Sequence, residues 1–497
     1  MAEQTDEAPF DRSALQGDLS GRAVRGGSLT LASQAAKFGV KTVSTIALAR
    51  LLVPEDFGLI AMVTVVTALA GLIKDLGLSA ATVQSKTLNQ AQVSLLFWIN
   101  VALSALITGL VAASAPLVAR FYDEPRLVAI VIALSFTFLM SGLTAQHIAL
   151  MRRQMRYGRI AVVELGGGIS AIAVAIYLAA TGWGYWSLVI MQLVSAAGYM
   201  VLAWTVGRWR PSRPRRTDVR SLLSFGGFLT GFHFLNYFTK QADKALIGWS
   251  LGASELGLYS KAYALFKLPM KQLNPPFMAV ALPVLSMLQT EPERFRHYYY
   301  RSVQVLAYLT VAPIAVVAAS SDIVIPLVLG SQWTEASRIF QYLALGGVVT
   351  PLLWTAGWVQ QALGRPNRML RWSFISDPIY VMSFFVGINW GAQGVALSFA
   401  ISIAILFLPT MAYAFHGSPL TLRGFLLAIH RPLVVGAFSF AVCMLAQRFV
   451  GSSGAVALFA SLGATFAAVV ALCALWPKLR REVLMQASLI RHLRARP

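Results

Sequence analysis

Long apolar stretches alternate with short polar segments along nearly the whole chain. The hydrocarbon core of a bilayer is about 30 Å thick, so a helix needs roughly 20 apolar residues to cross it. Stretches of that length recur from Leu29 almost to Trp476. The pattern therefore predicts an all-α integral membrane protein with about 14 transmembrane helices.

We expect these helices to form two lobes of six, followed by two more. The first lobe, residues 28–206, has spans at 28–50, 57–79, 92–117, 127–150, 160–181 and 184–206. The second lobe, residues 222–415, has spans at 222–249, 256–286, 302–329, 335–362, 368–389 and 392–415. The last two spans, 431–450 and 454–476, lie within residues 416–476. The remaining segments are an N-terminal tail (1–27), a basic linker (207–221) and a basic C-terminal tail (477–497).

Composition supports a membrane protein and narrows its chemistry. Of the 497 residues, 57% are hydrophobic and 12% are charged, and the mean hydropathy of +0.65 is too apolar for a soluble chain. The net charge of +21 would suggest nucleic-acid binding in a soluble protein, but these basic residues lie in short loops, so no nucleic-acid partner is expected. Two cysteines, Cys443 and Cys473, support neither a disulfide framework nor a metal site.

The distribution of Lys and Arg predicts that both termini are cytoplasmic. With the spans above, 29 of the 41 basic residues fall on the side of the N-terminus, 5 on the opposite side and 7 within spans. Cytoplasmic loops of membrane proteins carry such an excess. The first 26 residues lack the pattern of a cleaved signal peptide, so we expect the first span to act as the targeting signal.

A faint internal repeat relates the two predicted lobes. At an offset of 199 residues, Lys41 corresponds to Lys240 and Gly58 corresponds to Gly257. Both segments read as a span that carries a Lys, a short acidic turn and a Gly-Leu pair that opens the next span. Two repeats of six spans are typical of alternating-access transporters.

Seven lysines lie inside predicted spans, where a charged side chain is costly. A Lys at mid-bilayer costs roughly 2.5 to 3.5 kcal/mol even on lenient insertion scales. Three pairs are spaced i, i+4, so both members of each pair share one helix face and repel each other. We predict that the lysines line a hydrated cavity and bind an anionic substrate; the alternative is that some snorkel or satisfy backbone carbonyls. They are Lys37, Lys41, Lys240, Lys244, Lys261, Lys267 and Lys271.

Three acids inside predicted spans are candidates for coupling transport to a proton or sodium gradient: Glu164, Asp243 and Asp377. Asp243 lies between Lys240 and Lys244 and at i, i+3 can neutralise Lys240, so structural pairing is favoured for it. No basic residue lies close enough to Glu164 or Asp377 in the sequence to neutralise a buried carboxylate. The partner of each must come from another helix, or the acid must be protonated. No cofactor is expected beyond such a gradient.

A cluster of arginines follows the fourth span and includes Arg152, Arg153 and Arg156. Such a cluster is typical of a topology determinant, and contact with a phosphate headgroup is the alternative. The sequence contains no Walker loop, zinc-ligand spacing or nucleophile elbow, and no predicted outer loop is long enough to fold alone. These observations favour a transporter over an enzyme.

Three blocks, residues 47–86, 148–193 and 241–288, resemble oligosaccharide flippases of the Wzx type, in particular the branch that exports colanic acid and exopolysaccharides. The second block contains the arginine-rich turn, a small-residue helix and a Gly-aromatic hairpin, and the third contains the opening of the second lobe. The resemblance implies the fold of the multidrug, oligosaccharidyl-lipid and polysaccharide exporter superfamily, in which two six-helix lobes form a V around a central cavity.

The resemblance also implies a substrate and a location. The substrate would be an undecaprenyl-pyrophosphate-linked oligosaccharide, flipped across the bacterial inner membrane for assembly of an exopolysaccharide or O-antigen-type polymer. Membrane lipids, a polymerase and chain-length or export proteins would be its partners. Three alternatives stay open at this point. The first is a multidrug or cation antiporter on the same fold, and the second is a membrane-embedded glycosyltransferase or polymerase that uses the same lipid carrier. The third is a catalytically silent scaffold in a polysaccharide assembly complex.

Overall fold

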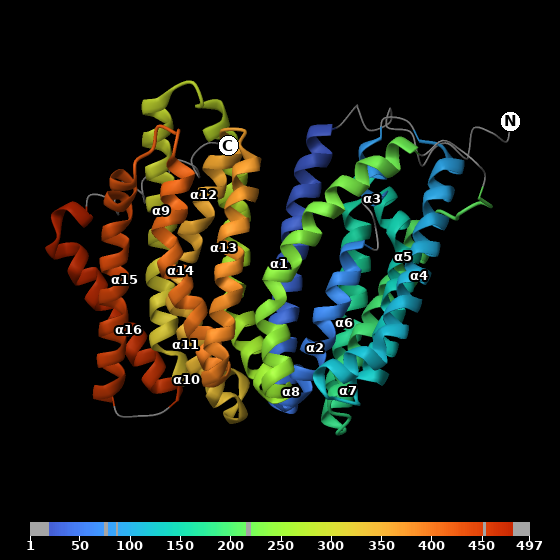
Figure 1. The fold of residues 1–497 in the computed structure, drawn as a ribbon, viewed down its shortest axis with the longest axis horizontal. Helices are drawn as coiled ribbons and strands as arrows, with labels where there is room; N and C mark the ends of the chain where they lie inside the picture. Colours follow the sequence, from blue (N-terminus) through green and yellow to red (C-terminus); the bar gives the residue numbers. More distant parts are fainter. Residues whose placement is uncertain (1–18, 74–77, 86–87, 215–219, 451–453, 481–497) are drawn as a thin grey trace. The chain divides into compact units, whose positions relative to one another are not determined.

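The computed structural model describes residues 19–73, 78–85, 88–214, 220–450 and 454–480. Within these ranges, the side chains of 19–28, 31, 72–73, 78, 80–81, 220–240 and 268–273 are not described. The described residues form helices joined by short connections and contain no strand (Figure 1). The prediction of an all-α protein is therefore confirmed.

The chain divides into two compact units, Met1–Gly257 and Leu258–Pro497. The described residues of unit 1 form seven complete helices and the first part of the long helix α8 (Arg220–Met287). The seven are α1 (Leu19–Leu51), α2 (Pro54–Ile73), α3 (Leu78–Gln84), α4 (Gln90–Tyr122), α5 (Leu127–Arg153), α6 (Tyr157–Ala180) and α7 (Tyr185–Gly207). This division lies within α8, whereas the predicted lobes are separated at the linker 207–221.

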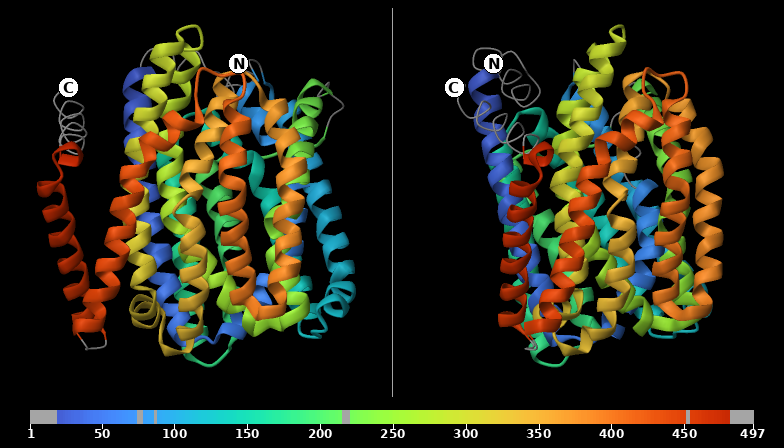
Figure 2. Two further views of the ribbon diagram at one scale, coloured as in Figure 1. Left: turned by 60° about the vertical axis from the view of Figure 1, so that its left-hand side comes forward. Right: turned by 90° about the vertical axis from the view of Figure 1, so that its left-hand side faces the viewer.

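Unit 2 holds the rest of α8 and the helices that follow it (Figure 2). These are α9 (Pro292–Ala319), α10 (Ser321–Leu329), η2 (Ser331–Trp333), α11 (Thr334–Gly347), α12 (Thr350–Ala362), α13 (Pro366–Gly387), η3 (Ile388–Trp390), α14 (Gly391–Phe415), α15 (Leu422–Val450) and α16 (Ala455–Leu475). The last two form a neighbouring pair, and α15 also packs against α9.

All fourteen predicted spans fall on helices, but their boundaries differ. Predicted span 302–329 begins ten residues earlier, at Pro292, and breaks between α9 and α10. Predicted span 335–362 breaks between α11 and α12, where Pro351 occupies the first turn of α12. Among the described residues, ten segments are long and apolar enough to cross a membrane, and two of them, Ser331–Ala362 and Pro366–Phe415, each contain two α-helices. The count of fourteen crossings remains a prediction.

The long helix α8 is two helices joined at Gly252. This residue has φ 83° and ψ −174°, a conformation that strongly favours glycine. The break separates the predicted spans 222–249 and 256–286, so the turn expected between them is a single residue with non-helical geometry. Just beyond it the chain passes from unit 1 to unit 2.

Two glycines related by the internal repeat pack against each other in unit 1. A Cβ atom on Gly58 would overlap the carbonyl oxygen of Ala253, and a Cβ atom on Gly257 would overlap the carbonyl oxygen of Pro54. Pro54 and Ala253 are also 199 residues apart, so the contact is reciprocal under the repeat, as in a two-fold symmetric interface. Close backbone approach through small residues is typical of helix crossings in membranes.

Helices α4 and α5 of unit 1 are joined by a seam of small and polar residues. The hydroxyl of Thr108 on α4 donates to the carbonyl oxygen of Ser135 on α5 at 3.2 Å. A Cβ atom on Gly142 would collide with Ser104 and come within 2.9 Å of the carbonyl oxygen of Asn100, so glycine is required for this approach. Packing of this kind replaces the hydrophobic effect, which is absent between helices in lipid.

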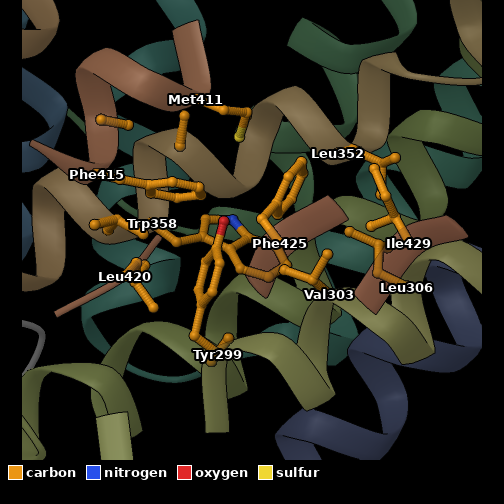
Figure 3. Packing of buried hydrophobic residues seen from close by; sticks show 14 of the residues in the cluster. Tyr299, Val303, Leu306, Leu352, Trp358, Met411, Phe415, Leu420, Phe425 and Ile429 are labelled. Atoms are coloured by element: carbon orange, nitrogen blue, oxygen red, sulfur yellow. The ribbon is translucent and has the colours of Figure 1, made fainter. Parts of the chain in front are cut away.

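The main core of unit 2 lies between α9, α12, α14 and α15 (Figure 3). Figure 3 shows Tyr299 and Trp358 packed with Phe415 and Phe425, and all four are buried. The hydroxyl of Tyr299 shares a hydrogen bond of 2.8 Å with the hydroxyl of Thr355, so the buried phenol is satisfied. Complementary aromatic packing therefore holds these helices together.

Candidate functional site

Helices α1 and α6 of unit 1 run side by side in the same direction and bring two charged residues together (Figure 1). Leu29, early in α1, lies within 3.3 Å of the Cβ position of Gly158 at the start of α6. Further along both helices, Leu48 packs with Ala175. Lys37 and Glu164 lie between these contacts, about 12 Å beyond Leu29 at 1.5 Å per residue. Both therefore lie well inside their helices rather than at an end.

Glycines position α7 against the same region of α6. A Cβ atom on Gly167 would lie 3.0 Å from the backbone nitrogen of Tyr199, so the two helices approach closely at this point. The approach brings the hydroxyl of Tyr199 to 3.5 Å from Oε1 of Glu164, at the long limit of a hydrogen bond. The small-residue run after Glu164 thus places a hydroxyl donor beside the carboxylate.

The ammonium of Lys37 donates to Oε2 of Glu164 and forms an ion pair with it. The Lys37 side chain is 39% exposed and that of Glu164 is 19% exposed, so the pair is accessible from the lysine side. The partner of Glu164 thus comes from another helix, one of the two possibilities that the sequence left open. A lone Lys within a membrane span would be far more costly than this pair.

Lys41 lies one turn beyond Lys37 on α1 and is exposed. It shares a helix face with Lys37, as the i, i+4 spacing predicts. No hydrogen bond or ion pair to Lys41 occurs among the described residues. Lys37 and Lys41 therefore present one paired and one unpaired ammonium on the same stretch of α1.

Three further predicted site residues of unit 1, Lys240, Asp243 and Lys244, lie on α8. Asp243 is buried, and its Oδ1 accepts the backbone N–H of Lys244 at 2.8 Å. The ammonium of Lys244, which is half-buried, donates to Oε1 of Gln241 at 3.2 Å. The side chain of Lys240 lies outside the described residues, so its predicted pairing with Asp243 remains a prediction.

The described lysines of unit 2 lie against aromatic rings. The ammonium of Lys267 is 4.2 Å from the centre of the Tyr263 ring, and that of Lys261 is 6.0 Å from the centre of the buried Trp333 ring. Both distances are compatible with cation–π attraction. The side chain of Lys271 lies outside the described residues. Asp377, half-buried on α13, accepts a hydrogen bond of 3.3 Å from the hydroxyl of Ser376.

The three arginines predicted to contact headgroups separate into two environments. Arg153 is 4% exposed, and its guanidinium donates to the carbonyl oxygens of Thr82 at 3.2 Å and Ser85 at 2.6 Å. It therefore fastens the segment around α3 to α5, which argues against contact with a headgroup. Arg152 and Arg156 are exposed. Partial burial and the nearby charges of Arg159 and Arg208 lower the pKa of Arg156, and a bound anion would relieve that repulsion.

Sequence analysis did not identify the aromatic partners or the buried polar groups of this region. Tyr263 lies four residues before Lys267, and this spacing was a usable signal. Tyr199 had no such signal, because it approaches Glu164 only through the packing of α7. His147 is also almost fully buried, between the rings of Phe97, Trp204 and Trp209, a cluster that no local pattern indicates.

Comparison with known proteins identifies the family. The model of a family described as polysaccharide biosynthesis protein matches residues 47–338, well over half of the chain. The chain belongs to this family. The matched range includes Glu164, the lysines of α8 and the whole of all three blocks that carry the predicted resemblance. This result confirms the expected relationship to polysaccharide exporters.

Individual relatives and a solved structure agree with the family. The teichuronic acid biosynthesis protein TuaB of Bacillus subtilis (strain 168) is 26% identical over 396 residues, which are 77% of this chain and 81% of that protein. The succinoglycan biosynthesis transport protein ExoT of Rhizobium meliloti (strain 1021) is 28% identical over 326 residues, 64% of this chain and 65% of that protein. The lipid II flippase MurJ, in an inward closed conformation, aligns with a TM-score of 0.65 at 13% identity and covers 89% of this chain and 97% of that one. The last likeness establishes the fold alone.

Proposed function

We propose that this protein is a flippase that moves a lipid-linked oligosaccharide across the membrane during polysaccharide biosynthesis. The family match and the transport relative support a transporter rather than an enzyme. The observation that carries the proposal is the pair of lysines within α1: Lys41 is exposed on a helix face where an unpaired ammonium is costly, and Lys37 lies one turn away. An anion that arrives with the substrate would offset that cost.

The substrate in this proposal is an oligosaccharide linked to undecaprenyl pyrophosphate, in the bacterial inner membrane with both termini cytoplasmic. A diphosphate is a compact anion that ammonium groups hold as point charges. The prenyl chain stays in lipid while the sugar crosses through a hydrated path. Exposed Arg152 and Arg156 would meet the phosphates of lipids or substrate at one end of unit 1.

Alternating access is the mechanism that fits a chain built from two related halves. Each half contributes lysines within its helices: Lys37 and Lys41 on α1, and Lys261 and Lys267 on α8. In this proposal the diphosphate first binds to ammonium groups, and a rearrangement of the two units then opens the site to the other side. A proton gradient acting through an intramembrane acid would supply the energy.

The three alternative functions receive less support. A multidrug or cation exporter would present carboxylates to its cargo, whereas Lys41 is exposed and Glu164 is already occupied by Lys37. A glycosyltransferase or polymerase would need a catalytic group in a substantial loop. The connections between the described helices are short. A silent scaffold within an assembly complex would not need charged residues inside its helices.

Reconstitution tests the proposal directly. The purified protein is placed in lipid vesicles with a fluorescent oligosaccharide linked to a polyprenyl diphosphate, and an impermeant quencher reports the fraction exposed outside. We expect the protein to increase the rate of transbilayer movement at least tenfold over protein-free vesicles. Equal rates in both preparations, or export of a cationic dye in place of the lipid-linked sugar, would contradict the proposal.

A further inference from the structure

The carboxylate of Glu164 has few partners within the helix bundle. Its carboxylate is held by Lys37 on one oxygen and, among the described residues, by a long hydrogen bond from Tyr199 on the other. A hydrogen bond of 3.5 Å contributes little. Glu164 therefore depends chiefly on Lys37 for its stabilisation as a charged group.

Lys37, in contrast, remains accessible. Its side chain is 39% exposed although it is paired, and Lys41 is exposed one turn further along the same face. Residues spaced i, i+4 have Cβ atoms about 5 to 6 Å apart, and the flexible lysine stems extend beyond them. Two ammonium groups placed in this way can hold the two neighbouring phosphates of one diphosphate.

We infer that Glu164 is an internal competitor for the Lys37 ammonium, and that the diphosphate of the substrate must displace it in order to bind. The inference rests on the proposed function and adds a residue that sets affinity. In the substrate-free protein, the carboxylate occupies the position of the phosphate. When the substrate arrives, Lys37 exchanges one anion for another, and Lys41 supplies the second contact.

Displacement has a consequence for Glu164. A carboxylate that is 19% exposed in an apolar helix bundle and has lost its ammonium partner is strongly disfavoured as an anion. Among the described residues, the hydroxyl of Tyr199 is the only other partner of Glu164. Displacement of the carboxylate therefore carries a cost, and this cost lowers the affinity of the wild-type protein for the diphosphate.

The groups around Glu164 support this competition. Lys37 faces the carboxylate from α1 and Tyr199 faces it from α7. In Glu164→Gln no carboxylate competes for the Lys37 ammonium, so this variant should bind a diphosphate more tightly than the wild type.

Binding of geranylgeranyl diphosphate to the full-length protein in lipid nanodiscs tests the inference. We expect Glu164→Gln to bind this probe about tenfold more tightly than the wild type at neutral pH, which corresponds to about 1.4 kcal/mol. The matched control is Glu124→Gln, the same chemical change in an ion pair with Arg126 in the turn before α5. The control should bind the probe as the wild type does.

A charge-swapped variant covers the case in which Glu164→Gln does not fold. Lys37→Glu combined with Glu164→Lys keeps the ion pair but moves the ammonium from α1 to α6, away from Lys41. We expect about tenfold weaker binding of the probe, whereas a purely structural pair would leave the affinity unchanged. If the wild type binds the probe and folded Glu164→Gln binds it no more tightly, the inference is overturned and the proposed function still stands. No binding of the probe by any folded variant would contradict the proposed function itself.

Discussion

The lysines predicted to lie within spans have different partners in the two units. In unit 1, Lys37 is paired with a carboxylate from another helix. In unit 2, Lys267 and Lys261 lie over the rings of Tyr263 and Trp333. A carboxylate cancels the charge of a lysine and can be exchanged for another anion, whereas a ring attracts the ammonium without carrying a negative charge. Unit 1 therefore contains a partner that a bound anion can replace.

The ion pair of unit 1 depends on the packing of separate helices. Lys37 and Glu164 can pair only where α1 and α6 hold a fixed spacing, and glycines bring α7 against the same region of α6. In unit 2 the partners Tyr263 and Lys267 belong to one helix, so helical geometry alone brings them together. Disturbing helix packing should therefore affect the unit 1 pair much more than this unit 2 pair.

The largest effect is expected from Gly167→Leu. A Cβ atom at this position would lie 3.0 Å from the backbone nitrogen of Tyr199, and a leucine would force α6 and α7 apart. We expect a loss of about 3 kcal/mol in unfolding free energy, typical of severe overpacking. Thermal unfolding in detergent measures it. Gly168→Leu is the matched control, because nothing lies within 4 Å of its Cβ position. Equal melting temperatures for the two variants would show that this crossing is not tightly packed.

A smaller effect is expected from Lys37→Met. This variant leaves Glu164 without its ammonium partner, and since the pair is partly exposed the cost should be about 1 to 2 kcal/mol, less than for a fully buried pair. Adding Glu164→Gln to the same chain should restore most of the stability, because no carboxylate then remains to be neutralised. Unfolding curves of the single and double variants test this. A double variant less stable than the single one would show that the carboxylate contributes something other than this pair.

The smallest effect is expected from Tyr263→Leu in unit 2. The variant removes the ring beneath Lys267, and the leucine keeps only part of the apolar contact that the ring makes with Tyr259, Phe266 and Phe399, so the loss should be about 1 kcal/mol. The same unfolding assay measures it. A loss larger than that of Lys37→Met would reverse the comparison between the two units.

Much of the fold could be predicted from the sequence because the bilayer sets the length of each helix. The described parts of the fourteen apolar stretches lie on helices, and the turn expected between spans 222–249 and 256–286 is the break in α8. Boundaries were missed where helices continue beyond the apolar stretch. For example, α9 begins with the polar residues that follow Pro292. Hydropathy cannot detect such extensions, because the polar end of a helix can continue beyond the apolar segment that crosses the membrane.

The candidate site could be predicted only in part. Periodicity placed Lys37 and Lys41 on one face of α1, and the lack of a local cation indicated that Glu164 needs a distant partner or a proton. The identity of that partner depends on how α1 lies against α6, which no single-helix pattern contains. The same limit applies to Tyr199 and to the burial of Arg153, whose partners lie on other segments.

The most direct test of the account is the rate of flipping by Lys41→Ala in lipid vesicles, measured with the fluorescent diphosphate-linked oligosaccharide. Lys478→Ala, in an exposed position after α16, is the matched control for loss of one lysine. We expect the rate of Lys41→Ala to fall at least tenfold at equal amounts of folded protein, and the rate of Lys478→Ala to equal that of the wild type. Equal rates for Lys41→Ala and the wild type would contradict the claim that ammonium groups of α1 bind the substrate.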